Sequence, residues 1–581
     1  MGVSPAIFES GGQRSEHYVP GVYGRSFNIS SPTGVSAGNL CILGKSNGGE
    51  PYKMLEIGSI ADAKQALVGG ELLDAVGYAF SGSSTFIPQR VFAMRVNDGT
   101  QSSITLKTGA TDLLLVKSWD WGVHTNQLKM MVSDGTVSNS KKIRVAYKDK
   151  ETVIDNITNS VMTINYGGEG QNPTVQVLTN KISLAAETIP SDPEADPEPT
   201  DLLEVNFSDF DTIDAVVAYI NNSDAWQGAV VGNNAEFKSA KLDTINTTPI
   251  GDTALTLYAN FDAFVTALKS IPYIGSVSIL DSTTRVVPDN DDSYVYFTGG
   301  TVGDYTVTQW QEALEALSIE DVQIIATPST DASVHALISA HCTSMSDVIH
   351  RKERTAILGG AVGMSDSDAI AAAIGFNNKL VSYCCDNPIK INIVTGEQET
   401  LSGAMLGVML AAMESAMSPN TPLTFKMLNV LGFTKIRDVA NITTLIKAGL
   451  MVCNANPENL TEYICIRALT TFQGDDLINS ERSMVREDLF MNRDLRAQFK
   501  SVIGTTGVST NAVVQTLINR AKEWALNGYI VPSDSNENVW DIKVRIDGDK
   551  IYLTFSRYLT APVNFVFITA VNHIYTTTLE M

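Results

Sequence analysis

The chain has 581 residues, of which 44% are hydrophobic, so it can bury more than one core and is expected to form about two to four domains. Its formal net charge of −23 argues against a nucleic-acid-binding protein, because an acidic surface repels phosphates. The charge is uneven, since residues 191–300 hold 18 acidic and 4 basic residues, whereas 481–528 hold 5 acidic and 7 basic residues. This asymmetry predicts two faces with different partners.

The first 100 residues predict an arm followed by an α/β unit. Residues 1–27 have no helical period, and Pro20-Gly21 predicts a turn within an extended arm. In 28–100 the pattern predicts a strand, two helices and a second strand, at 39–43, 60–67, 70–80 and 90–96. This order is typical of the first part of an α/β core.

Residues 101–300 are expected to form one or two inserted β-rich domains. Strand-like runs separated by Gly, Asn and Asp turns lie at 104–106, 113–116, 128–132 and 143–147. The stretch SDPEADPEPTD, 191–201, is expected to be an exposed acidic loop, because its prolines oppose both helix and sheet.

The alternation of strand and helix patterns returns in residues 301–480. The pattern predicts a buried strand, a helix, a further apolar strand and a second helix, at 321–327, 331–350, 356–358 and 402–417. These elements are expected to complete the α/β core.

The last part of the chain, 481–571, predicts a separate C-terminal domain. Residues 510–527 predict a helix, with a cap at Ser509 or Thr510 and Gly528 just past its end. The turn Asp547-Gly548-Asp549 predicts a hairpin between strands at 540–546 and 551–558. A third strand, 564–571, is expected to continue into a tail, 572–581.

No group of residues predicts catalysis, a cofactor or a bound metal. Gly38–Ser46 approximates a phosphate loop, but its glycines are one residue too far apart and no helix follows. Asp289–Asp292 starts like a calcium loop without the Gly and Glu that such a loop needs. His335, His341 and Cys342 have no second cluster to complete a zinc site. The chain is therefore expected not to be an enzyme.

The sequence predicts neither export nor insertion into a membrane. Met1–Pro5 lacks the basic start and apolar core of a secretion signal. The longest apolar stretch, 401–417, contains Glu414 and is too short to span a bilayer. The cysteines show no CxxC spacing and are expected to be reduced core residues of a protein assembled in the cytoplasm: Cys41, Cys342, Cys384, Cys385, Cys453 and Cys465.

Several segments, in their order and spacing, resemble contractile bacteriophage tail sheath proteins, in particular those of large lytic phages of Gram-positive hosts. They are YVPGVY (18–23), CILGKSNGGEP (41–51), GGELLDAVGYAF (69–80), RVFAMRVND (90–98), WDWGVHTNQLKMMV (119–132), FTGGT (297–301), DVQIIATPSTDASVHALI (321–338) and the C-terminal helix with its hairpin. The chain departs from the family at Gly24-Arg25-Ser26, where an acidic residue is frequent, and in the two extra residues between Gly122 and Asn126.

The resemblance implies a multidomain α/β and α+β structural subunit of the virion. Its conserved α/β core would be built from 28–100 and 301–480, with β-rich insertions at 101–300, a tube-proximal domain at 481–571, and extended arms at 1–27 and 572–581. Hexameric rings would stack helically around the tail tube and contract irreversibly, driving the tube through the host envelope for genome ejection. The implied partners are other copies, the tail tube protein, and the baseplate and tail terminator proteins, with no nucleic acid and no direct membrane insertion.

Both arms are suited to exchange strands between copies. The residues expected to do so are Tyr18, Val19, Val22, Tyr23, His573, Ile574, Tyr575, Thr576 and Thr577. The C-terminal tail is β-prone and nearly uncharged, so it can add to an exposed sheet edge of another copy. The alternative is a last intramolecular strand or a frayed end.

Arg520 and Lys522, on the helix of the less acidic C-terminal domain, are candidate contacts to the tube. The alternative is that they belong to a solvated helix face. Because no nucleotide site is evident, the extended lattice is expected to be metastable, with contraction burying more subunit surface.

Three other functions stay open at this point. The same architecture would serve a bacterial contractile injection system or a phage-tail-like bacteriocin. A multidomain hydrolase or transferase with a site made of scattered residues is a second possibility. A receptor-binding adhesin fits less well, because such proteins are strand-repetitive and this chain has α/β segments without repeats.

Overall fold

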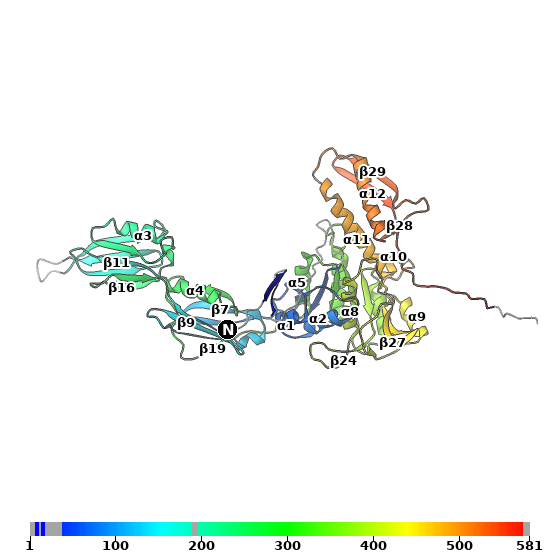
Figure 1. Cartoon of the computed structure of the whole chain (residues 1–581), viewed down its shortest axis with the longest axis horizontal. Helices are drawn as coiled ribbons and strands as arrows, with labels where there is room; N and C mark the ends of the chain where they lie inside the picture. The colour runs from blue at the N-terminus through cyan, green and yellow to red at the C-terminus, as the bar shows by residue number, and fades with distance from the viewer. Residues whose placement is uncertain (1–5, 11–12, 18–37, 189–195, 573–581) are drawn as a thin grey trace, which may run out of the picture. The chain divides into compact units, whose positions relative to one another are not determined.

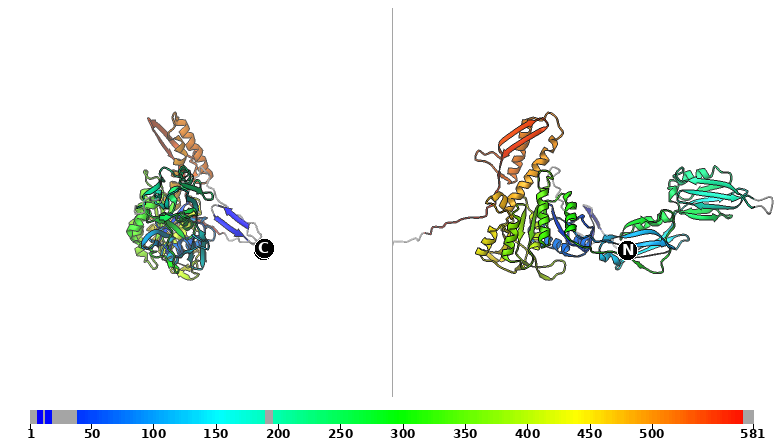
Figure 2. Two further views of the ribbon diagram at one scale, coloured as in Figure 1. Left: turned by 90° about the vertical axis from the view of Figure 1, so that its left-hand side faces the viewer. Right: turned by 180° about the vertical axis from the view of Figure 1, so that it is seen from behind.

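The computed structural model describes residues 6–10, 13–17, 38–188 and 196–572. The chain divides into two compact units (Figures 1 and 2). The first unit comprises Met1–Ile42, Ala75–Phe92 and Ser318–Met581, and the second comprises Leu43–Asp74 and Ala93–Leu317. Each unit is therefore assembled from segments that lie far apart in the sequence.

A six-stranded sheet, in the order β22-β21-β20-β3-β5-β4, forms the α/β core. Its strands are β3 (Leu40–Gly44), β4 (Met54–Ile57), β5 (Val91–Arg95), β20 (Ile324–Ala326), β21 (Thr355–Gly359) and β22 (Val381–Cys384). β3, β20, β21 and β22 pair in parallel, and every residue of these four strands is buried. Largely apolar, fully buried strands of this kind are typical of a parallel sheet whose faces are both covered.

Helices connect and cover these parallel strands. α6 (Ala332–Met345) follows β20, and α7 (Asp366–Phe376) follows β21, because parallel neighbours need a crossover. α8 (Gly403–Ser415) packs against β20, β21 and β22 and is buried almost all round. Its first turn is capped by the Ser402 hydroxyl, which accepts a hydrogen bond from the Met405 amide at 3.1 Å.

A buried ion network joins α8 to α11 (Arg482–Phe499). Arg482 donates to both oxygens of Glu414, from Nε at 2.8 Å and from Nη2 at 2.7 Å. Nη1 of Arg486 lies 3.5 Å from the same carboxylate. Burial by itself raises the pKa of Glu414, but the two arginines outweigh it and hold that pKa below its usual value. The carboxylate therefore stays ionised in the interior.

The same arginine also reaches the central sheet. Nη1 of Arg482 donates to the Ala356 carbonyl at 3.0 Å and to the Ser382 hydroxyl at 3.1 Å, and Nη2 donates to the Thr355 hydroxyl at 3.1 Å. One side chain thus ties the start of α11 to β21, β22 and α8.

The other elements of the first unit are short. They are β1 (Ala6–Ser10), β2 (Gln13–His17), β23 (Pro388–Ile391), β24 (Gln398–Thr400), β25 (Gly432–Phe433), α9 (Val439–Lys447), β26 (Val452–Asn456), β27 (Asn459–Arg467) and α10 (Leu477–Ser480). α2 (Glu71–Ser81) crosses the boundary between the units. β1 and β2 form an antiparallel hairpin in register Ala6↔His17 to Ser10↔Gln13. The N-terminal arm therefore contains a pair of antiparallel strands. The sequence had predicted only an extended arm with a turn at Pro20-Gly21.

The second unit contains antiparallel sheets with two hydrophobic cores. The first core lies among β6 (Gln101–Thr108), β7 (Thr111–Trp121), β8 (Lys129–Asp134), β9 (Lys141–Tyr147), β10 (Lys150–Ile157), β18 (Ile274–Ile279), β19 (Val295–Tyr296) and α4 (Asn260–Lys269). The second lies among β11 (Ser160–Tyr166), β12 (Gln171–Val177), β13 (Lys181–Glu187), β14 (Pro199–Asn206), β15 (Trp226–Val230), β16 (Ile245–Pro249), β17 (Leu255–Tyr258) and α3 (Ile213–Ile220). α1 (Ile60–Leu67) and α5 (Val307–Ser318) complete the helices described for this unit.

Arg95 ties together both ends of the inserted region. Its guanidinium is fully buried and donates to the carbonyls of Gly49 at 2.8 Å, Trp121 at 3.1 Å and Val302 at 2.7 Å. Burial lowers its pKa to about 10, although nearby carboxylates oppose the shift. The β-rich insertion is thus closed at its base by one charged side chain that is satisfied by main-chain carbonyls.

The expected mixture of α/β and antiparallel β structure is confirmed, and so are the helices at 60–67, 70–80, 402–417 and 510–527 within one or two residues. The helix expected over 331–350 ends at Met345. The helices α3 and α4 were not expected in the β-rich region. The division into six segments stays a prediction. Within the described ranges no helix is long and apolar enough to cross a bilayer.

The ion network predicts a large effect of one substitution. Glu414→Ala leaves two buried arginines without their carboxylate and should lower the free energy of unfolding by about 3–5 kcal/mol. Chemical denaturation followed by circular dichroism measures this loss. Asp547→Ala removes an exposed ion pair with Arg545 and should change the same quantity by less than about 1 kcal/mol. Equal effects of the two substitutions would contradict the role of the network.

Candidate assembly interface

The C-terminal domain is built on two helices and a hairpin. Its elements are α11, a 3₁₀ turn at Lys500–Val502, α12 (Thr510–Leu526), β28 (Ile530–Val531), β29 (Trp540–Asp547), β30 (Lys550–Ser556) and β31 (Tyr558–Leu559). Its core consists of Met491, Leu517, Ala521, Trp524, Ile530 and Val539. Figures 1 and 2 show α11 and α12 side by side, with the β29–β30 hairpin against them. The helical spacing of the apolar residues on α12 thus buries one face of that helix.

The hairpin β29–β30 is a two-stranded sheet, in register from Lys543↔Thr554 to Asp547↔Lys550. Gly548 has φ of +60°, which the tight turn between the strands requires. Within the part of the chain that the structure describes, neither outer edge of this sheet pairs with another strand. Open edges present free N–H and C=O groups, so each can accept a further strand.

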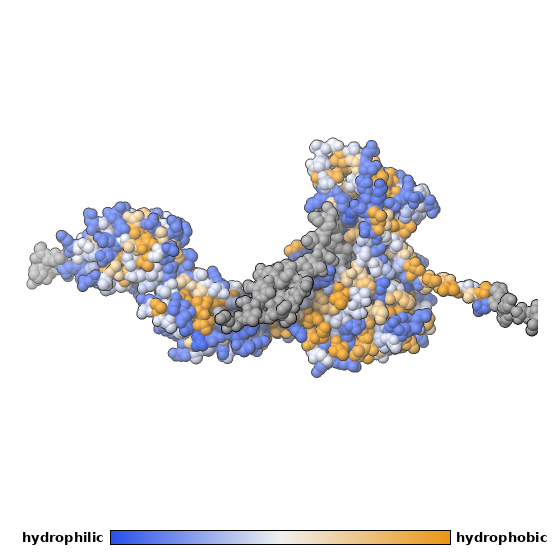
Figure 3. Space-filling view, in the orientation of Figure 1, coloured by the Kyte–Doolittle hydropathy of each residue, from blue (hydrophilic) through white to orange (hydrophobic). Residues whose placement is uncertain are grey.

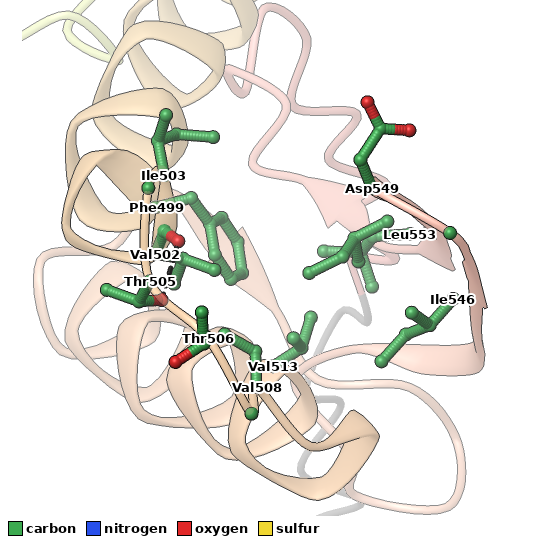
Figure 4. A pocket seen from close by; sticks show the side chains of 14 residues that line it. Phe499, Val502, Ile503, Thr505, Thr506, Val508, Val513, Ile546, Asp549 and Leu553 are labelled. Carbon is green, nitrogen blue, oxygen red and sulfur yellow. Dashed lines mark hydrogen bonds between the residues drawn. The ribbon is translucent and has the colours of Figure 1, made fainter.

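An apolar groove of about 670 Å³ lies between the far end of the hairpin and the connection from α11 to α12. Its apolar lining consists of Phe499, Val502, Ile503, Val508, Val513, Ile546, Ile551 and Leu553. Figure 4 shows Phe499, Val502 and Val513 facing Ile546 and Leu553 across open space, with Asp549 at the rim. Ile503 is 81% exposed although it is fully apolar. Open apolar surfaces of this kind mark binding sites.

The segment that follows the domain, 561–572, is named the C-terminal segment here. It forms no helix or strand, although a strand was expected over 564–571. That prediction was wrong, because β propensity is fulfilled only where a partner strand is present. Its large apolar side chains are open to solvent, with exposed fractions from 66% to 92% at Val563, Phe565, Val566, Phe567, Ile568 and Val571. Figure 3 shows this stretch as a hydrophobic run that leaves the first unit.

The residues expected to exchange strands lie outside the described residues. They are Tyr18, Val19, Val22 and Tyr23 in the first arm, and His573, Ile574, Tyr575, Thr576 and Thr577 in the second. Their roles stay predictions.

The two candidate tube contacts differ in their surroundings. Arg520 is largely buried, and Nη2 donates to Asp494 at 2.6 Å, while Asp494 also accepts a hydrogen bond from Nε1 of Trp524 at 2.7 Å. Asp494 itself is fully buried. Arg520 therefore holds α12 on α11, whereas Lys522 points to solvent on the same helix. The tube-contact prediction stays untested for both, and Lys522 is the more exposed of the two.

A buried carboxyl on α11 lacks the partners that an ionised group needs. Glu487 is fully buried, and neither of its oxygens has a hydrogen-bond partner among the described residues. Burial raises its pKa to about 9, with Arg557 opposing and Asp488 adding to the shift. Glu487 is therefore a neutral carboxylic acid at pH 7.

Sequence reasoning placed the arm at 572–581 and missed that the exposed apolar part begins about ten residues earlier. It also missed the groove, whose walls come from the end of α11, the connection from α11 to α12, α12 itself and the β29–β30 hairpin. One signal was available, since Val563 to Ile568 is an apolar run that follows a hairpin already complete in itself.

The unpaired carboxyl predicts a pH dependence of stability. Glu487 keeps its proton in the folded chain up to about pH 9, whereas an exposed Glu releases it near pH 4.5. The contribution of Glu487 to the free energy of unfolding is therefore fully present below pH 4.5 and should fall between pH 4.5 and 9, by at most about 1.4 kcal/mol per pH unit. Hydrogen exchange of the α11 amides at pH 5 to 8 measures this slope.

The matched variants are Glu487→Gln and Glu523→Gln, the latter at an exposed position of α12. Glu487→Gln should flatten the slope, and Glu523→Gln should leave it unchanged. An unaltered slope in Glu487→Gln would exclude this carboxyl as its source.

Comparison with known proteins finds relatives along most of the sequence. No family model matches the chain. It is 24% identical to the tail sheath protein of Staphylococcus phage Twort, over 85% of this chain and 88% of the relative. It is 25% identical to the tail sheath protein of Bacillus phage SP01, over 96% of this chain and 95% of the relative.

Solved structures show the same fold. The sheath tail protein from Listeria innocua superposes with a TM-score of 0.54 at 12% identity, over 90% of this chain and 96% of that chain. The sheath tail protein from Desulfitobacterium hafniense superposes with a TM-score of 0.50 at 14% identity, over 93% of this chain and 100% of that chain.

Proposed function

Because the chain belongs to the phage tail sheath proteins, we propose that its copies are joined into one connected lattice by their C-terminal segments. The chain is the subunit of a contractile tail sheath, a structural protein of the virion and not an enzyme. The contact that joins one copy to the next is the part of this function that we propose.

One observation carries the proposal: the chain exposes an apolar segment and an apolar groove, and the groove lies beside a sheet edge that pairs with no other strand among the described residues. A lone copy leaves the side chains of Phe565 and Phe567 in water, at 66% and 92% exposure. Burying them against another copy removes that surface from water at about 25 cal/mol per Å². Main-chain hydrogen bonds to the open edge of β29 or β30 would fix the orientation of the segment on the sheet.

Strand addition is the mode that suits these parts. The segment contains β-branched and aromatic residues without a charge from Val563 to Val571. Residues of this kind fit a pleated, half-buried surface. Added to the hairpin, the segment would turn a two-stranded sheet, marginal by itself, into a stable one. The N-terminal arm, 1–27, would add a strand in the same manner at the other edge.

The lattice would consist of rings of six copies stacked helically around the tail tube. Rings at its ends would meet the baseplate and the tail terminator proteins. Links through flexible segments would let the rings rotate and approach one another without separating. The energy of contraction would come from subunit surface buried in the shortened lattice, so no nucleotide is needed.

The uneven distribution of charge along the chain indicates which surfaces would face solvent and which would face the tube. Residues 191–300, with 18 acidic and 4 basic residues, would face solvent, where like charges discourage contacts between sheaths. Residues 481–528, with 7 basic and 5 acidic residues, would lie toward the tube.

Removal of the anchors should stop polymerisation but not folding. The double substitution Phe565→Ser and Phe567→Ser changes side chains that are exposed in the single chain, so the free energy of unfolding should stay within about 0.5 kcal/mol of the original. Negative-stain microscopy and sedimentation should show single subunits where the unaltered chain forms striated hollow tubes. Thr569→Ala, in the same segment, is the control and should still form tubes.

Truncations separate the two arms. Deletion of 561–581 should abolish tubes, and deletion of 572–581 alone should weaken them. Tubes of normal length after loss of both 1–20 and 561–581 would disprove linkage by the arms.

The tube-facing assignment has its own test. Lys522→Glu should reduce assembly of the sheath on purified tubes at least tenfold while leaving stability unchanged, because its side chain is exposed. Arg520→Glu would instead place a second carboxylate beside buried Asp494 and should destabilise the domain by about 3–5 kcal/mol. Normal assembly of Lys522→Glu would remove this residue from the tube interface.

A further inference from the structure

The C-terminal segment is held to its own unit by a small cluster, named the arm clamp here: Arg467, Glu481, Asn564 and Phe565. Nδ2 of Asn564 donates to Oε2 of Glu481 at 3.3 Å, and Nε of Arg467 lies 3.8 Å from the same oxygen. The Arg467 guanidinium lies 5.7 Å from the centroid of the Phe565 ring. Beyond Phe565, the described chain makes no hydrogen bond or ion pair with the segment.

The clamp and the groove lie at opposite ends of α11. Glu481 immediately precedes this helix, whereas Phe499 is its last residue and lines the groove. Eighteen residues of α-helix rise about 27 Å. From Asn564, three residues of extended chain reach Phe567 within about 11 Å. The clamped anchors therefore cannot reach the Phe499 wall of the groove in their own chain.

Release of the clamp would remove this restriction. The last fixed residue would then be Thr560, which donates from its amide to the Tyr529 carbonyl and from its hydroxyl to the Gly528 carbonyl. The preceding Leu559 packs on the domain core that contains Met491, which precedes Phe499 by eight residues, or about 12 Å of helix. Phe567 follows Thr560 by seven residues, which span up to about 25 Å when extended. The groove of the same chain would then be within reach.

We propose that the arm clamp positions the C-terminal segment so that it docks on a second copy and not on its own groove. This inference rests on the function proposed above and names the residues that make the docking intermolecular. Arg467 and Glu481 are positioning residues, since they act through Asn564 and Phe565.

The contacts of the arm clamp hold the C-terminal segment only weakly. Three of its buried polar atoms have no hydrogen-bond partner among the described residues: Oε1 of Glu481, Nε of Arg467 and Oδ1 of Asn564. Burial raises the pKa of Glu481 to about 7, while Arg467 and Asn564 oppose the shift. Unsatisfied buried groups weaken a contact, so the segment can adjust its direction when neighbouring copies move.

The test uses the full chain with Arg467→Gln and Asn564→Ala, both at half-buried positions where a substitution is tolerated by the fold. Hydrogen–deuterium exchange is measured on unpolymerised chains at low concentration. In the unaltered chain, amides 563–571 should exchange at the rate of open chain. In the double variant, amides 563–571 and 546–553 should exchange at least tenfold more slowly, because the segment occupies its own groove. Polymerisation should slow at least tenfold as well.

Asn511→Ala, at an exposed position of α12, is the matched control and should behave as the unaltered chain. Equal exchange and equal polymerisation rates in the double variant and the unaltered chain would overturn the clamp. The underlying function has a separate readout. If polymers of the unaltered chain showed no slowing of exchange at 546–553 and 563–571, the segment would dock elsewhere and both proposals would fail.

Discussion

The carboxylate of Glu414, held between Arg482 and Arg486 in the interior, is the interaction on which the functional end of the molecule depends. It joins α8 of the core to the first turn of α11, and Arg482 extends the contact to β21 and β22. A well-packed apolar cluster could supply similar stability, but apolar contacts have no direction. Bidentate pairing fixes the angle at which α11 leaves the core.

The surfaces that this helix carries are incomplete in a single copy. The hairpin has two open edges, the groove is open, and the C-terminal segment exposes its aromatic side chains. Each feature would be a liability in a monomeric protein, since open edges and apolar patches promote association. In the polymer proposed above they would become the contacts.

The second unit differs from the C-terminal domain, because each of its two hydrophobic cores is filled by residues of the unit itself. Each core buries its own aliphatic and aromatic residues, and Arg95 closes the base of the insertion through main-chain carbonyls. Such insertions tolerate change in loops like 196–198 at little cost to the rest of the fold.

The sequence by itself determined the elements whose signal is local. Apolar runs fixed β3 and β21, the Ser509 cap and helical spacing fixed α12, and Asp547-Gly548-Asp549 fixed the hairpin, because each depends on residues a few positions apart. It also indicated the family through the order of its segments. Tertiary structure alone decided the groove, the pairing of Arg520 with Asp494 and the clamp at Asn564, since Arg520 and Asp494 lie 26 positions apart and Asn564 and Glu481 lie 83 apart. It decided as well that 564–571 stays unpaired, because β propensity states what a segment can do, and only the fold states whether a partner strand is present.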